Sequence, residues 1–91
     1  MFHVLTSTYL QPPDVIAQTR PAHLQFLEDE IAAGRLVLAG RQESGAGGVL
    51  ITGDLGTEAV QDIIDRDPYT RAGVATYDVV GFNAAVRAPG L

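Results

Sequence analysis

The chain has 91 residues, of which 46% are hydrophobic and 19% charged, with a formal net charge of −5. These values indicate one globular domain over residues 1–91. Cysteine is absent, which excludes disulfides, thiolate metal ligands and a cysteine nucleophile. The six basic residues are all arginines scattered along the chain, so the sequence offers no basic run for binding nucleic acid.

The first residues do not resemble a secretion signal, because Met1 to Leu5 lack a charged region followed by an apolar one. No apolar run approaches the ~20 residues that a membrane helix needs. We therefore expect a cytoplasmic protein that does not bind membranes.

The first third of the chain predicts a strand followed by a helix. Residues 2–9 are rich in β-branched and aromatic side chains, which is typical of a strand. Residues 15–33 have the apolar spacing of a helix, with Gly34 as its end. Pro21 leaves two alternatives: a helix that starts there, capped by one of the two preceding residues, or a longer helix that kinks there.

The middle of the chain predicts a hairpin and a second helix. Residues 36–40 and 49–52 are short apolar strands, joined by the glycine-rich connection 42–48. The second helix is expected to follow Thr57, whose hydroxyl is suited to an N-cap, and to end before Pro68.

A turn is predicted between the second helix and the last strand. Pro68 disfavours helix at Asp67 and is itself suited to a first helical position. Asp67 is therefore expected both to end one helix and to cap a short helical turn. Gly73 ends that turn, and residues 74–86 predict a final strand with Gly81 as the position for a bulge.

The order of these elements, β-α-β-β-α-β, predicts an α+β, ferredoxin-like domain with a four-stranded antiparallel sheet and both helices on one face. The opposite face is left uncovered. Apolar side chains fill both sides of the second and third predicted strands, and charged residues are few. We therefore expect a homodimer that forms through the open sheet face.

Three short motifs follow one another between residues 20 and 73: Arg20-Pro21-x-His23-Leu24, then Gly34-Arg35-Leu36-Val37-Leu38-Ala39-Gly40, then Asp67-Pro68-Tyr69-x-x-Ala72-Gly73. In this order and spacing they resemble the YCII (YciI-like) family. The resemblance implies a subunit that pairs into a dimeric α+β barrel, and a pocket whose histidine and aspartate correspond to His23 and Asp67. Most members have no assigned reaction. One characterised relative is a dehydrochlorinase of a chlorinated hydroxyquinol, and the fold resembles muconolactone isomerase.

The chain departs from the family pattern after the second predicted strand. Members commonly carry Gly-Pro at this point, whereas this chain has Gly40-Arg41 followed by a long glycine-rich hairpin. The substrate class therefore stays open.

The candidate catalytic pair is His23 and Asp67. A histidine can take or give a proton near neutral pH, and a carboxylate bonded to one ring nitrogen fixes its tautomer and favours the imidazolium. Arg20 and Arg71 are candidates to hold an anionic oxygen of a small-molecule ligand, and Tyr69 is a candidate hydrogen-bond donor. This set is suited to proton abstraction followed by loss of a leaving group or by isomerisation, without a cofactor.

Each of these residues also has a structural interpretation. His23 fits the rim of a core, and capping alone explains Asp67. Tyr69 fits a packed aromatic position, while Arg20 and Arg71 fit surface charges.

Metal and phosphate sites are disfavoured. Two histidines and an acidic run scattered around a helix do not provide a metal site, and the glycine-rich hairpin lacks the lysine of a phosphate loop.

The alternative to a lyase or isomerase is a binding or accessory module that holds a small ligand without reaction. A third hypothesis is haem handling, with His23 as the axial ligand.

Overall fold

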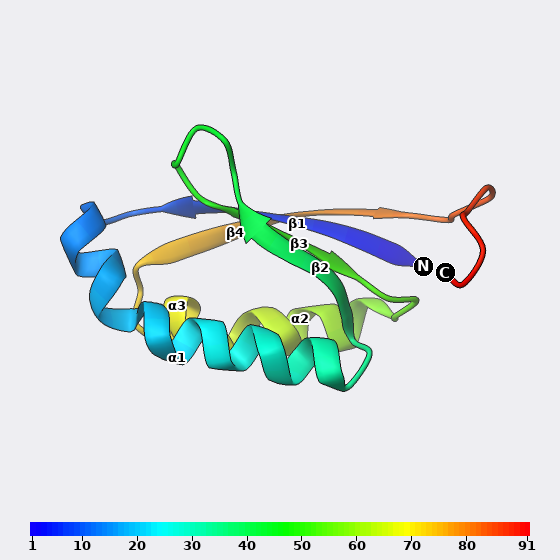
Figure 1. Ribbon diagram of the computed structural model, residues 1–91, viewed down its shortest axis with the longest axis horizontal. Helices are drawn as coiled ribbons and strands as arrows, with labels where there is room; N and C mark the ends of the chain where they lie inside the picture. Colours follow the sequence, from blue (N-terminus) through cyan, green and yellow to red (C-terminus); the bar gives the residue numbers. More distant parts are fainter.

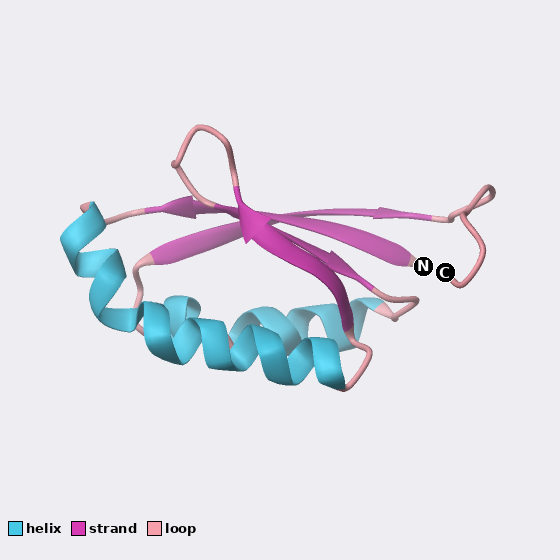
Figure 2. Ribbon diagram, in the orientation of Figure 1, coloured by secondary structure: helices cyan, strands magenta, loops and turns pink.

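The computed structural model describes residues 1–91, in which one face of a four-stranded antiparallel sheet is covered by helices and the other is open (Figures 1 and 2). The strand order is β2-β3-β1-β4. This arrangement confirms the predicted α+β, ferredoxin-like sheet. The elements are β1 (Phe2–Tyr9), α1 (Pro13–Ala32), β2 (Leu36–Arg41), β3 (Gly48–Thr52), α2 (Thr57–Arg66), α3 (Pro68–Arg71) and β4 (Ala75–Phe82).

The first helix is continuous through Pro21, which decides between the two alternatives for this segment. It begins two residues earlier than predicted, because Pro13 is pre-organised for the first helical position. Its first turns are inclined to the rest (Figure 1), as expected where a proline removes a helical hydrogen bond. Gly34 adopts a φ of 77° directly after the C-cap. None of the helices combines the length and hydrophobicity needed to cross a lipid bilayer.

Of the two capping predictions around α2, the one for Asp67 at its end is confirmed and the one for its start is not. Asp67 is the C-cap of α2 and the N-cap of α3, where its carboxylate accepts from the Tyr69 backbone N–H at 2.9 Å. Gly73 follows α3 with a φ of 70°. The prediction of Thr57 as the N-cap of α2 is wrong: Gly56 holds that position, and no side chain caps the helix there.

The last strand is shorter than predicted. β4 ends at Phe82, which pairs with Phe2 at the start of β1, so the strand stops where its pairing partner stops. The expected bulge at Gly81 is also wrong, because the pairing with β1 continues through this residue without a shift. The irregularity in the sheet lies instead between Leu36 and Leu38 of β2.

Alternation along the strands separates a buried face from an open one. In β1 the odd-numbered side chains from His3 to Ser7 are buried beneath the helices, and Leu5 belongs to the larger core cluster. On the open face Leu38, Val80 and Phe82 remain exposed. The core consists of two clusters, one of Leu5, Leu27, Leu36, Leu50, Val60 and Ile63, and one of Ile16, Tyr69, Val74 and Ala75.

A buried glutamate joins α1 to α2 through ion pairs with two partly exposed arginines. The side chain of Glu30 is 1% exposed and contacts both Arg35 and Arg66, with its Oε1 2.6 Å from the Arg66 Nη1. Burial alone would raise the pKa of Glu30, but the hydrogen bonds and charges of the two arginines outweigh burial and lower it below 4.5.

The lowered pKa of Glu30 predicts a specific dependence of stability on pH. Its contribution should be complete above about 4.5, the ordinary value for this group, and should be lost as the pH falls through the lower value of the folded chain. Glu30→Gln should therefore lower the free energy of unfolding by about 1–3 kcal/mol at neutral pH. The difference from wild type should disappear in acid, as measured by urea unfolding across a pH series.

Glu28→Gln is the matched control, because Glu28 is exposed on the same helix and forms no ion pair. It should behave like wild type at every pH. A Glu30→Gln deficit that persisted unchanged into acid would contradict the role of the Glu30 charge.

Candidate functional site

Two side chains that lie 44 positions apart in the sequence meet between α1 and α3. The Nδ1 of His23 lies 2.7 Å from the Oδ1 of Asp67. His23 is carried by the part of α1 that follows Pro21, and Asp67 is fixed at the junction of α2 and α3. The fold therefore brings the imidazole of His23 into contact with the carboxylate of Asp67, which the sequence alone could not establish.

The carboxylate of Asp67 is fully buried and accepts hydrogen bonds from three directions. Its Oδ1 accepts both from His23 and from the Tyr69 backbone N–H, while its Oδ2 accepts from the hydroxyl of Tyr77. The same oxygen thus caps α3 and orients the histidine. The second oxygen connects the carboxylate to β4 through Tyr77. This arrangement leaves the carboxylate with one fixed orientation.

The contacts of His23 define which ring nitrogen is available. An ionised carboxylate only accepts hydrogen bonds, so the Nδ1 beside Asp67 carries the proton and Nε2 is the acceptor. The ring also stacks on Tyr69, with centroids 3.8 Å apart and an angle of 9° between the planes. The hydrogen bond to Asp67 therefore restrains the imidazole within the plane of its ring, and stacking on Tyr69 restrains it perpendicular to that plane.

Two phenols beside the pair stay protonated near neutral pH. Burial raises the pKa of Tyr77, and the charge of Asp67 raises it further. Burial also raises the pKa of Tyr69, although the positive charge of Arg20 acts in the opposite direction. Tyr77 can therefore donate to the carboxylate but cannot serve as a base.

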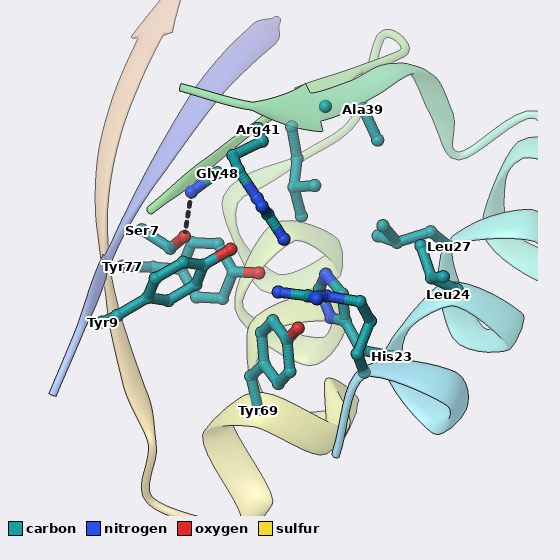
Figure 3. A pocket seen from close by; sticks show the side chains of 13 residues that line it. Ser7, Tyr9, His23, Leu24, Leu27, Ala39, Arg41, Gly48, Tyr69 and Tyr77 are labelled. Atoms are coloured by element: carbon teal, nitrogen blue, oxygen red, sulfur yellow. Dashed lines mark hydrogen bonds between the residues drawn. The ribbon is translucent and has the colours of Figure 1, made fainter. Parts of the chain in front are cut away.

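His23 lines a cavity of about 310 Å³ between α1 and the sheet (Figure 3). Arg20 and Tyr69 line the same cavity, and Asp67 lies outside the lining, against the histidine. The full lining is Ser7, Tyr9, Arg20, His23, Leu24, Leu27, Ala39, Gly40, Arg41, Gly48, Leu50, Tyr69 and Tyr77.

The structure does not place Arg71 at this cavity. Arg71 is exposed at the end of α3 and is absent from the lining. Arg71 was predicted as a site residue because it is close to Asp67 in the sequence, and its backbone N–H does donate to the Asp67 carbonyl oxygen, but its side chain is exposed away from the cavity lining. The chain also has no cluster of three or more His, Asp or Glu side chains that could hold a metal ion.

The YCII-related domain family matches residues 1–83 of this sequence. The chain belongs to the YCII-related family. A "12 kDa protein" of Mycolicibacterium smegmatis is 75% identical over 24 residues, which are the whole of that relative's sequence and 26% of this chain.

A solved structure shares the fold of this YCII-related chain. It is 5-chloro-2-hydroxyhydroquinone dehydrochlorinase from Burkholderia phenoliruptrix, in complex with 2,5-dihydroxybenzoquinone. The likeness has a TM-score of 0.74 at 21% identity, and it covers 91% of this chain and 94% of the other.

Three cavity residues of this YCII-related protein were missed by sequence reasoning. Tyr77 and Tyr9 both lie on the helix-covered face of the sheet, and Tyr77 pairs with Ser7 of β1. Strand alternation could have found them once the register of β4 was known. Arg41 stands at the position where the resemblance expects proline, and that departure was the available signal.

The other histidine has a structural role. His3 is buried in β1, and its Nε2 is 3.0 Å from the carbonyl oxygen of Leu55. It lies outside the lining of the His23 cavity.

Proposed function

We propose that this YCII-related protein is a cofactor-independent enzyme of the lyase or isomerase type, in which His23 transfers a proton of a small aromatic or otherwise enolisable substrate. The observation that carries the proposal is the 2.7 Å contact between His23 and a fully buried carboxylate, at the wall of a cavity. A base oriented by an acceptor-only partner is the arrangement that favours proton abstraction.

The reaction proceeds in two steps. First, the Nε2 of His23 takes a proton from a C–H or O–H group of the substrate, and the bonding electron pair stays on the substrate as an enolate or phenolate. The Asp67 carboxylate stabilises the imidazolium that results. In an elimination, the electron pair then expels an anionic leaving group, and the imidazolium releases its proton to water. In an isomerisation, His23 returns the proton to a different carbon.

Two further residues are proposed to bind the substrate. The guanidinium of Arg20 lies where it can bind the oxygen on which negative charge develops. The hydroxyl of Tyr69 lines the same cavity as Arg20 and stays protonated, so it can donate to the same oxygen. Arg71 has no role in this proposal.

The dehydrochlorinase that shares the fold supports this reaction class. Its name describes the loss of chloride from a hydroxylated ring, and it holds a hydroxylated quinone. A single ring also fits a cavity of about 310 Å³. These features support the class of chemistry, and the substrate of this protein is left to experiment.

Proton exchange tests the proposal without knowledge of the substrate. Wild-type protein is incubated in D₂O with a panel of small ketones, phenols and halogenated hydroquinones, and the loss of C–H signals is followed by NMR. We expect exchange in at least one compound, above the rate in buffer, and none with His23→Asn. Compounds that bind without exchange would favour the alternative of a binding or accessory module.

We further propose that two copies pair through the open face of the sheet. Leu38, Val80 and Phe82 are exposed on that face, and an apolar hollow of about 340 Å³ lies between the sheet and the tail. Apolar side chains gathered on one face favour association, because pairing removes them from water.

Val80→Lys is expected to weaken this pairing by at least about 100-fold, because a buried lysine loses its hydration. Analytical ultracentrifugation over a range of concentrations measures the change. Gln18→Lys, an equal change of charge on the exposed side of α1, should leave the assembly intact. A wild-type protein that sediments as a monomer at all concentrations would contradict the pairing.

A further inference from the structure

The cavity beside His23 contains positive charge and no negative charge. It adjoins a second hollow, and the two share Tyr9, Arg20 and Arg41. Neither lining includes an aspartate or a glutamate, although the chain has eleven of them and a net charge of −5. A basic cleft in an acidic protein is therefore a local feature rather than an effect of composition.

The two arginines of this cleft lack acidic partners. Elsewhere in the protein, Arg35 and Arg66 both contact Glu30. No ion pair includes Arg20 or Arg41. Arginine is always charged, and its planar fork of donors matches an oxyanion. Unpaired guanidinium groups in a cleft attract anions from solution.

The second arginine is held in place by the backbone around it. Arg41 ends β2, where it pairs with Gly48 of β3. The hairpin beyond it is anchored to β1, since Gln42 Nε2 donates to the Ser7 carbonyl oxygen at 2.9 Å and the Tyr9 N–H donates to the Ala46 carbonyl oxygen at 2.9 Å. Gly45 and Ala46 of this anchored hairpin line the second hollow.

The close contact between the hairpin and β1 depends on Gly47. A Cβ at this position would lie 1.7 Å from the Ser7 carbonyl oxygen, so only glycine fits. Figure 3 shows the side chain of Arg41 reaching from β2 into the cavity, towards the space between Tyr77 and His23. Arg20 enters from α1, three positions before His23. The two guanidinium groups therefore come from opposite walls.

We infer that the ligand of this site is a small organic anion, whose carboxylate or other oxyanion is bound by Arg41 together with Arg20. Arg41 determines this specificity together with Arg20. The inference that the anion is a substrate rests on the proposed function, in which His23 takes a proton from the same molecule. The preference for an anion rests on the cleft alone.

A matched pair of probes tests the preference. Binding of 2-hydroxybenzoate and of its neutral analogue 2-hydroxybenzamide is measured by NMR titration of the wild-type protein. We expect the anion to bind at least about 10-fold more tightly, and its affinity to fall as salt is added. Arg41→Gln and Arg20→Gln should each remove most of the preference, whereas Arg41→Lys, which keeps the charge, should retain part of it.

Arg71→Gln is the control, because it removes the same charge at a position outside the cleft. Equal affinity for the two probes, no binding of the anion at about 1 mM, or an equal loss in Arg71→Gln would overturn the inference. His23→Asn should keep the anion preference while losing proton exchange. If the wild-type protein preferred the anion but exchanged no protons with any compound, the proposed reaction would be contradicted, whereas the anion site would still be supported.

Discussion

Replacing His23 with asparagine is expected to slow proton transfer by about 10²–10⁴-fold while leaving the fold nearly unchanged. Asparagine keeps a polar group near Asp67 but has no group that gains or loses a proton near neutral pH. The ring of His23 lines the cavity and stacks on Tyr69 of the smaller core cluster, so its replacement loses that one contact and leaves the larger cluster intact. The measurements are the exchange rate for an active compound and the thermal unfolding midpoint of the same samples.

The second histidine provides a control for this experiment. His3 is buried under the helices and is hydrogen-bonded to a backbone carbonyl oxygen. His3→Asn should lower the free energy of unfolding by about 1–3 kcal/mol without a specific loss of activity. If His23→Asn unfolded as readily as His3→Asn, or if it exchanged protons at the wild-type rate, the catalytic role of His23 would be wrong.

Asp67→Ala is expected to be the most destabilising single change considered for this protein, by about 3–5 kcal/mol. Its carboxylate is fully buried, and it is the common acceptor for His23, the Tyr69 N–H and the Tyr77 hydroxyl. Without it, three donors lose their partner and α3 loses its cap. Urea unfolding measures the loss, which is a large fraction of the roughly 5–15 kcal/mol typical of a folded domain.

Tyr77→Phe separates one of these contacts from the rest. It removes only the hydroxyl that donates to Asp67 Oδ2, so the expected loss is smaller, about 1.5–3 kcal/mol. A loss below about 0.5 kcal/mol in Asp67→Ala, the size of an ordinary surface change, would show that the carboxylate does not hold this junction together.

Local signals explain what could be predicted from the sequence. Pro68 and Gly73 restrict or permit particular backbone angles, so the double role of Asp67 as C-cap and N-cap could be read directly from its neighbours. The order of strands and helices followed from the same kind of pattern. Thr57 failed as a cap because Gly56 is equally able to hold the N-cap backbone, and composition does not decide between them.

The parts that could not be predicted depend on pairing between distant segments. The end of β4 is set by the end of β1, and the register between them decides that Tyr77 faces the helices. Without that register, the hydrogen bond from the Tyr77 hydroxyl to Asp67 cannot be predicted. Arg41 likewise reaches the cavity only because the hairpin is fastened across β1.

The shared acceptor at Asp67 bears on how relatives of this protein can be compared. The acid both orients the imidazole and closes the helical junction, so a homologue that abandoned the chemistry would still need it to fold. An Asp-Pro-Tyr signature is thus a marker of architecture. Under the proposed function, His23 is the residue whose identity would distinguish a catalytic homologue from one that keeps only the fold.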